Sequence, residues 1–269
     1  MAAFSDTHCH LYFNSFENDL AAVLQRAKDV GISRILIPGT DLASSRQAVA
    51  LAEQHSGLYA AVGVHPNDAT TWNGETLANL ADLARHPRVL AIGEIGLDYY
   101  RDFAVPELQR SILEQQLELA TRLSKPVVIH SRAALPDLLP RIQEWYAALI
   151  RAGSPLAQRP GVFHAFDGTL ETARQIIQMN FLIGVGGPIT YPNARDRREL
   201  VAELPLSSLL LETDAPYLAP QQQRGRRNEP AFIPFIAEKI AELHSLPVNE
   251  IAQTTQNNAN RLLAWDNLD

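Results

Sequence analysis

Short apolar runs that alternate with longer amphipathic segments are the feature that most restricts how this chain can fold. The runs are almost continuously apolar until their last residues, which is typical of parallel strands buried on both faces. We expect strands that begin near residues 4, 34, 59, 89, 126, 161, 181 and 209. Helical patterns lie between them. In 106–124, for example, Pro106 suits the first turn of a helix and Pro126 ends the pattern.

Eight strand–helix units predict a (β/α)8 TIM barrel, an α/β fold, with one domain over residues 1–269. The competing architecture is a doubly wound open sheet. A dinucleotide-binding sheet of that kind would carry G-x-G-x-x-G at its first strand-to-helix turn, and this chain has no such motif there. The segment from Pro230 onward is expected to form two helices, broken near Pro247, around the outside of the barrel.

The composition argues against a secreted protein, a membrane protein and a protein with a broad groove for duplex nucleic acid. With 46% hydrophobic and 20% charged residues the chain can bury a sizeable core. It shows neither a secretory signal nor an apolar run near the ~18 residues that span a bilayer. The single cysteine, Cys9, suits a reducing compartment, so we expect a cytoplasmic protein without membrane contact or an obligate protein partner. The net charge of −7 argues against a broad groove for duplex nucleic acid, although bound cations would invert the field locally.

Histidines gather where the apolar runs end, and in a TIM barrel the carboxyl ends of the strands carry the chemistry. His8 and His10 share one face of an extended chain, because successive side chains alternate, and can therefore converge on one metal ion. A lone histidine is more often a hydrogen-bonded core residue. Five at equivalent positions favour a metal site. The five are His8, His10, His65, His130 and His164.

Carboxylates follow the same rule. Glu94 and Asp98 close the fourth run, and Glu212 and Asp214 close the eighth. For Glu94 and Asp214 the alternative interpretation is helix capping, and for Asp98 a turn. We interpret Asp6 as a hydrogen-bond support for a neighbouring histidine rather than as a ligand, and expect a similar supporting place for Asp98 and Glu212.

The residue types and the lysine count restrict the kind of metal site. Imidazoles and carboxylates without thiolates suit zinc, manganese or magnesium. Five or six such side chains exceed the needs of one catalytic zinc, so we expect two or three divalent ions. Many related barrels bridge their metals through a carbamylated lysine at a strand end. Here Lys28 and Lys239 lie in helical segments and Lys125 precedes its strand, which leaves Glu94 as the best bridge.

The motifs FSDTHCH, VGVHP, GEIGLDYYR, PVVIHSR and LLLETDAP resemble those of the TatD family of metal-dependent hydrolases and deoxyribonucleases over essentially the whole chain. GVGGPITYP is most similar to its YjjV-like branch. The resemblance implies a TIM barrel with a divalent-metal cluster. The implied ligands are His8, His10 and Asp214 for one ion, His130 and His164 for another, and Glu94 for both.

The resemblance also implies roles in catalysis. His65 would contact a substrate phosphate. Beyond the resemblance, we expect Asp214 to orient the attacking water and accept its proton, as a carboxylate beside a metal-bound nucleophile can. We also expect Arg132, and Arg227 and Asn228 in the loop after the last strand, to bind further phosphates; for that loop a solvated surface is the alternative interpretation. The implied substrate is single-stranded DNA, or RNA, trimmed from its 3′ end.

Two positions depart from the family's usual pattern. Asp167, in HAFDG, replaces a small polar residue and adds a negative charge, and Ala133-Ala134 follow HSR where an acidic residue is usual. Two alternatives of different kinds stay open: a small-molecule amidohydrolase or lactonase on the same barrel, and a binding or scaffolding barrel without catalysis. The lack of a bridging lysine weakens the first, and the complete set of ligands weakens the second.

Overall fold

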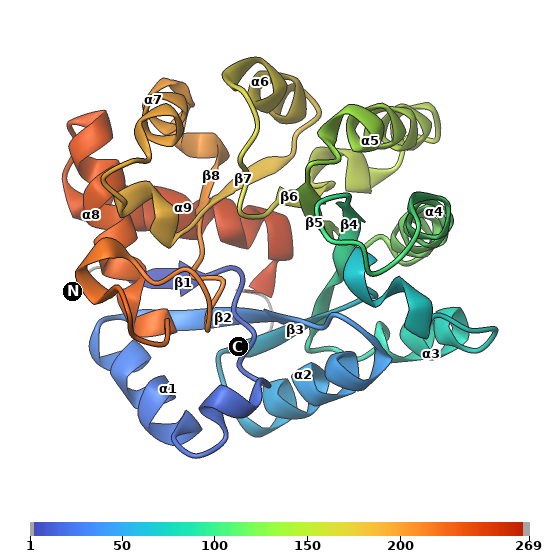
Figure 1. Cartoon of the computed structure of the whole chain (residues 1–269), viewed down its shortest axis with the longest axis horizontal. Coiled ribbons are helices and arrows are strands. Elements are labelled where there is room, and N and C mark those ends of the chain that lie inside the picture. The colour runs from blue at the N-terminus through green and yellow to red at the C-terminus, as the bar shows by residue number, and fades with distance from the viewer. Residues whose placement is uncertain (1–2, 266–269) are drawn as a thin grey trace. The chain divides into compact units, whose positions relative to one another are not determined.

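The computed structural model describes residues 3–265 and contains one eight-stranded parallel sheet with the order β1 to β8 (Figure 1). The strands are β1 (Phe4–Asp6), β2 (Ile32–Pro38), β3 (Leu58–Val62), β4 (Val89–Asp98), β5 (Val127–Arg132), β6 (Gly161–Phe163), β7 (Leu182–Val185) and β8 (Leu209–Leu211). The last strand returns to the first, because the N–H of Thr7 donates to the carbonyl of Leu211 (3.0 Å) and that of His10 to Ala215 (2.8 Å). The predicted (β/α)8 barrel is therefore confirmed.

Helices alternate with the strands along the chain. They are α1 (Leu20–Asp29), α2 (Leu42–Gln54), α3 (Thr76–Leu83), α4 (Pro106–Leu123), α5 (Leu135–Arg151), α6 (Leu170–Gln178), α7 (Arg195–Glu203), α8 (Ile233–His244) and α9 (Val248–Leu263). As predicted, α4 begins at Pro106, and the segment after Pro230 forms two helices that are separated at Pro247. Within residues 3–265 no helix is both long and apolar enough to cross a membrane.

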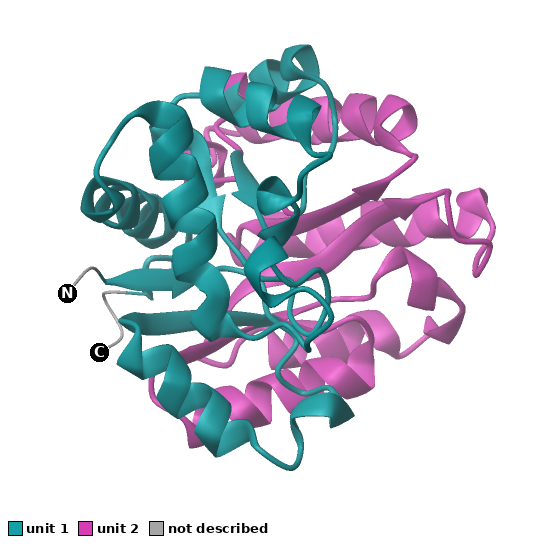
Figure 2. Cartoon of the chain, turned by 60° about the vertical axis from the view of Figure 1, so that its left-hand side comes forward, with its two compact units in different colours: residues 1–37, 165–177, 182–269 teal, residues 38–164, 178–181 magenta. Residues whose placement is uncertain are grey.

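The chain divides into two compact units (Figure 2). Unit 1 comprises residues 1–37, 165–177 and 182–269, and unit 2 comprises residues 38–164 and 178–181. Each unit has buried aromatic side chains of its own, such as Phe16 in unit 1 and Tyr59 in unit 2. The candidate site residues are also divided, so each unit presents its own cluster.

Two strand positions require glycine because a polar neighbour comes very close. A Cβ at Gly96 in β4 would lie 1.9 Å from the carbonyl oxygen of His130 in β5, and Gly96 has a φ of +150°. A Cβ at Gly184 in β7 would lie 2.2 Å from the Oε2 atom of Glu212, which follows β8. Since these distances are far below van der Waals contact, the absence of a side chain is what admits His130 and Glu212 at the strand ends.

Two buried glutamines of α4 fasten this helix to strand ends of unit 2. Gln109 accepts a hydrogen bond from the N–H of Asp98 (2.9 Å) and donates to its carbonyl (2.9 Å). Gln116 makes the same pair of bonds with Val64, at 2.7 and 3.0 Å. Because Val64 precedes His65 and Asp98 closes β4, α4 fixes the backbone at two of the candidate site positions.

Candidate metal centre

In unit 2, three imidazoles converge on one carboxylate oxygen. The Oε1 atom of Glu94 lies 2.8 Å from Nε2 of His164, 2.9 Å from Nδ1 of His130 and 3.4 Å from Nε2 of His65. Glu94 is 3% exposed, and His65 and His164 are buried as well. The structure thus brings together the residues that the ends of β3, β4, β5 and β6 were predicted to present.

Asp98 holds His130 from behind. Its Oδ2 atom lies 3.2 Å from Nε2 of His130, the ring nitrogen opposite the one that faces Glu94. Burial opposes protonation of His130, but contacts with Asp98 and Glu94 outweigh it and raise the pKa of the ring. Burial raises the pKa of Asp98, yet hydrogen bonds from His130 and from the backbone outweigh it and lower this pKa to about 2. A carboxylate behind a histidine is the usual support of a metal ligand.

The hydrogen bonds of His65 define its tautomer. Its Nδ1 atom accepts from the N–H of Asn67 (3.0 Å), so the proton of the neutral ring lies on Nε2, which faces Glu94. Burial, and then the charge of His130, lower the pKa of His65. A neutral imidazole with a proton on Nε2 is a hydrogen-bond donor, which is the property needed to bind a phosphoryl oxygen.

In unit 1 the H-x-H motif and the residue after β8 form a second cluster. The Nε2 atoms of His8 and His10 lie 3.1 Å apart, and Oδ1 of Asp214 lies 3.8 Å and 3.5 Å from them, respectively. Asp214 has a φ of +56°, a left-handed conformation that Asp tolerates better than most residues. In the segment that follows β1, His8 and His10 thus both direct their imidazoles toward Asp214.

Tyr12 supports this cluster, although the sequence analysis did not identify it. Its hydroxyl lies 3.1 Å from Nδ1 of His10 and so fixes the ring from the side opposite Asp214. Asp6, by contrast, binds Thr213 and the backbone of His8 rather than an imidazole ring. It accepts from the N–H (3.0 Å) and the hydroxyl (2.6 Å) of Thr213 and from the N–H of His8 (3.2 Å). Burial raises the pKa of Asp6 to about 7.

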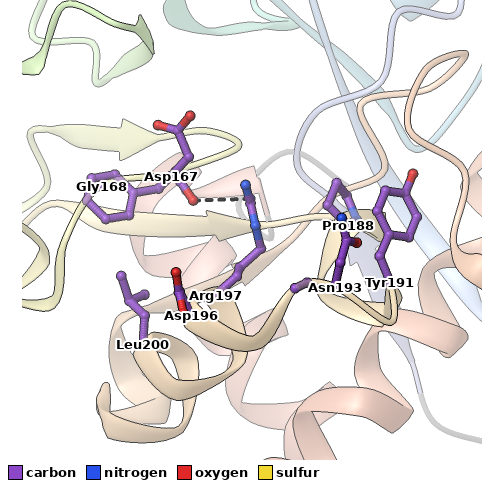
Figure 3. A pocket seen from close by; sticks show the side chains of 10 residues that line it. Asp167, Gly168, Pro188, Tyr191, Asn193, Asp196, Arg197 and Leu200 are labelled. Atoms are coloured by element: carbon purple, nitrogen blue, oxygen red, sulfur yellow. Dashed lines mark hydrogen bonds between the residues drawn. The ribbon is translucent and has the colours of Figure 1, made fainter.

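Glu212 directly follows β8, and Asp167 lies in the loop after β6. Glu212 is buried and accepts from the N–H of Ala165 (2.5 Å), which follows β6. Asp167 is exposed and lines a cavity of about 330 Å³ between the loops after β6 and β7 (Figure 3). At this cavity Arg197 of α7 donates to the carbonyl of Phe166 (3.3 Å). Asp167 therefore lies at the edge of this cavity, in the loop after β6.

The predicted phosphate contacts have different surroundings. Arg132 is exposed, and its Cζ atom lies 4.2 Å from the ring centroid of Tyr100. Arg227 pairs with Asp19, 2.7 Å away. Asn228 is fully buried and donates to the carbonyls of Thr213 (2.8 Å) and Tyr217 (2.6 Å). We therefore assign Asn228 to holding the loop after β8 and not to the substrate.

None of the three lysines ends a strand. Lys28 lies in α1, and Lys239 lies in α8 beside Glu242. Lys125 precedes β5 and donates to the carbonyl of Val89. The chain therefore provides no lysine that could be carbamylated to bridge two metals.

The donor atoms present suit divalent metal ions. Both clusters offer imidazole nitrogens and carboxylate oxygens without a thiolate, a set that fits zinc, manganese or magnesium. In unit 2, one atom from each of His65, Glu94 and His130 lies within 4.8 Å of the others. The donor atoms of this cluster therefore lie close enough to one another to surround a single cation.

Comparison with known proteins places this geometry in a family. The profile described as TatD related DNase matches residues 5–264. The uncharacterized metal-dependent hydrolase YabD of Bacillus subtilis is 39% identical over 96% of this chain and 97% of its own length. The 3′-5′ ssDNA/RNA exonuclease TatD of Edwardsiella piscicida is 37% identical over 96% of this chain and 98% of its own.

A solved structure agrees with this assignment. The crystal structure of YjjV, a TatD homologue from Escherichia coli K12, superimposes with a TM-score of 0.89 and 38% identity, over 97% of this chain and 98% of that one. The fold, the strand-end histidines and carboxylates, and the full-length similarity lead to the same conclusion. The chain belongs to the TatD family and is a metal-dependent hydrolase.

Proposed function

We propose that this protein hydrolyses phosphodiester bonds of single-stranded DNA, and of RNA, from the 3′ end with the aid of divalent metal ions. The observation that carries the proposal is the convergence of three imidazoles on Glu94 Oε1, at 2.8 to 3.4 Å. The name of the Edwardsiella relative, a 3′-5′ ssDNA/RNA exonuclease, supports this choice of substrate. The name of the Bacillus relative supports only the broader class of metal-dependent hydrolases.

We infer a requirement for two divalent ions. We assign His8, His10 and Asp214 to one ion, and His130 and His164 to the other. Glu94 would be the shared ligand, because it is the carboxylate on which the imidazoles of unit 2 converge and because no lysine stands at a strand end. Asp98 and Tyr12 would keep the rings of His130 and His10 in place.

In the proposed mechanism each side chain has a separate task. Bound metal ions would supply Lewis-acid chemistry, polarising the phosphoryl group and acidifying water. Asp214 would orient the attacking water and accept its proton, since its carboxylate is partly exposed at 16%. The Nε2–H group of His65 would donate to a non-bridging phosphoryl oxygen. Arg132 and Arg227 would contact phosphates farther along the strand.

A small-molecule amidohydrolase or lactonase on the same barrel is the second candidate. A barrel of this kind usually needs an anionic bridge between its metals, and here that bridge would also have to be Glu94. Two of the three lysines lie in α1 and α8, and the third donates to the carbonyl of Val89. None is placed to bridge two metals as a carbamylated lysine, which weighs against this candidate.

A panel of substrates separates the two candidates. Purified protein, supplied in turn with Mg²⁺, Mn²⁺ or Zn²⁺, is assayed on four compounds: a 3′-exposed single-stranded oligonucleotide, a 3′-blocked one, a lactone and an acetylated amino acid. We expect nucleotide release from the 3′-exposed strand, and a loss of activity with chelator. Turnover of the lactone alone would contradict the proposed function.

A further inference from the structure

The loop after β4 exposes several large apolar side chains. The exposed fraction is 66% for Tyr100 and 59% for both Phe103 and Val105. Exposed large apolar residues that lie together on a soluble protein commonly mark a binding surface. This loop belongs to unit 2 and begins directly after Asp98, the residue that holds His130.

An arginine lies over the ring of Tyr100 and another over the ring of Phe103. The guanidinium carbon of Arg132 lies 4.2 Å from the ring centroid of Tyr100, and that of Arg101 lies 6.0 Å from the centroid of Phe103. Across residues 3–265, neither arginine forms an ion pair with a carboxylate. We call Tyr100 with Arg132 the Tyr100–Arg132 platform. It combines a flat aromatic surface with a positive charge that no carboxylate of the described residues pairs with.

Hydrogen bonds connect the platform to the candidate metal ligands of unit 2. One oxygen of Asp98 accepts from the N–H groups of Tyr100 and Arg101, both at 2.9 Å, while the other lies 3.2 Å from His130. The N–H of Tyr99 donates to the carbonyl of Arg132 (2.9 Å), and Asp98 stands opposite Arg132 in the β4–β5 register. The backbone that carries Tyr100 is therefore held at a fixed position relative to His130.

We propose that the Tyr100–Arg132 platform stacks on an unpaired nucleobase of the strand whose phosphodiester bond is cleaved. The inference rests on the proposed function and names how its substrate is held. Aromatic rings bind single strands by stacking on the faces of bases, and guanidinium groups attract the backbone phosphates. A base inside a duplex has no free face, so the platform selects single-stranded chains. Because every base has such a face, recognition is tolerant of sequence.

Three variants test the platform by kinetics. Tyr100→Ala removes the stacking surface, and we expect a roughly tenfold rise in KM on a single-stranded oligonucleotide with kcat nearly unchanged. Tyr100→Phe keeps the ring and is expected to behave like the wild type. Val105→Ala, in the same loop and similarly exposed, is the control without a ring. An equal rise in KM for Tyr100→Phe and Tyr100→Ala would contradict stacking.

Abasic substrates identify the contact directly. A series of oligonucleotides, each lacking one base near the 3′ end, is cleaved by the wild type and by Tyr100→Ala. At one position we expect the missing base to lower kcat/KM of the wild type about tenfold and to make the two proteins equal. If Tyr100→Ala loses the same factor on every abasic substrate, its effect does not pass through a base and the proposal is wrong.

A binding measurement separates this inference from the proposed function. A fluorescent single strand with cleavage-resistant linkages is titrated with each variant, and its anisotropy gives the affinity. Wild-type protein that binds more tightly than Tyr100→Ala but cleaves nothing would leave the platform standing and contradict the exonuclease. Cleavage with an affinity unchanged by Tyr100→Ala would overturn the platform alone.

Discussion

His130 is held on both sides of its ring. Nδ1 lies 2.9 Å from Glu94 and Nε2 lies 3.2 Å from Asp98, so neither nitrogen can turn away without losing a carboxylate. His10 is fixed in a comparable way, between Asp214 and the hydroxyl of Tyr12. The candidate ligands are therefore oriented before a metal binds, which lowers the entropic cost of binding it.

Removing the support behind His130 tests this orientation. In Asp98→Asn the ring loses an anionic partner, and we expect metal affinity or activity to fall about 10- to 100-fold, as is usual for such supporting groups. Isothermal titration with Mn²⁺ measures the affinity. Asp102→Asn, at an exposed position of the same loop, is the matched control. Equal affinities for the two variants would contradict a supporting role for Asp98.

Glu94 and Asp214 could be predicted as site residues from the sequence, because each ends an apolar run that predicts a buried strand. Tyr12 was not predicted. That residue continues the alternation of His8 and His10, which is the one signal that could have identified it. Asn228 was interpreted as a phosphate contact because the residue follows three arginines in four positions. The side chain instead bonds backbone carbonyls that are distant in sequence, a contact that no local pattern encodes.

At the scale of elements, Gly96 in β4 and Gly184 in β7 are two positions where the neighbouring strand leaves no room for a side chain. The eight strands could be predicted because parallel strands buried on both faces leave continuous apolar runs. The pairs of hydrogen bonds that Gln109 and Gln116 make with the backbone could not be predicted. Their spacing of seven places both on one face of α4, but only the folded barrel shows that this face meets Asp98 and Val64.

The contact between β7 and the end of β8 gives a prediction at this scale. Gly184→Ala would place a Cβ 2.2 Å from the carboxylate of the buried Glu212, and we expect a loss of about 1–3 kcal/mol in the free energy of unfolding. A Cβ at Gly74 would meet no atom within 4 Å, so Gly74→Ala is the control. Thermal unfolding measures both. Equal midpoints of thermal unfolding for Gly184→Ala and Gly74→Ala would contradict the close contact between β7 and Glu212.

For the whole molecule, the net charge of −7 and the buried carboxylates lead us to expect that bound cations stabilise the folded state. Metal ions that bind the folded state alone stabilise it by mass action, by about 2.7 kcal/mol per site when their concentration is 100 times Kd. We expect Mn²⁺ to raise the midpoint of thermal unfolding and chelator to reverse the shift. A midpoint that is the same with and without metal would contradict a metal-binding barrel.

The rate of metal-dependent cleavage of a 3′-exposed single strand by Glu94→Ala tests the central claim most directly. Because Glu94 is proposed to be shared by both ions, we expect turnover to fall at least about 10²- to 10³-fold. Thermal unfolding without metal checks that the variant is folded, and Glu118→Ala, at an exposed position in α4, is the control. Turnover by folded Glu94→Ala equal to that of the wild type would contradict the account.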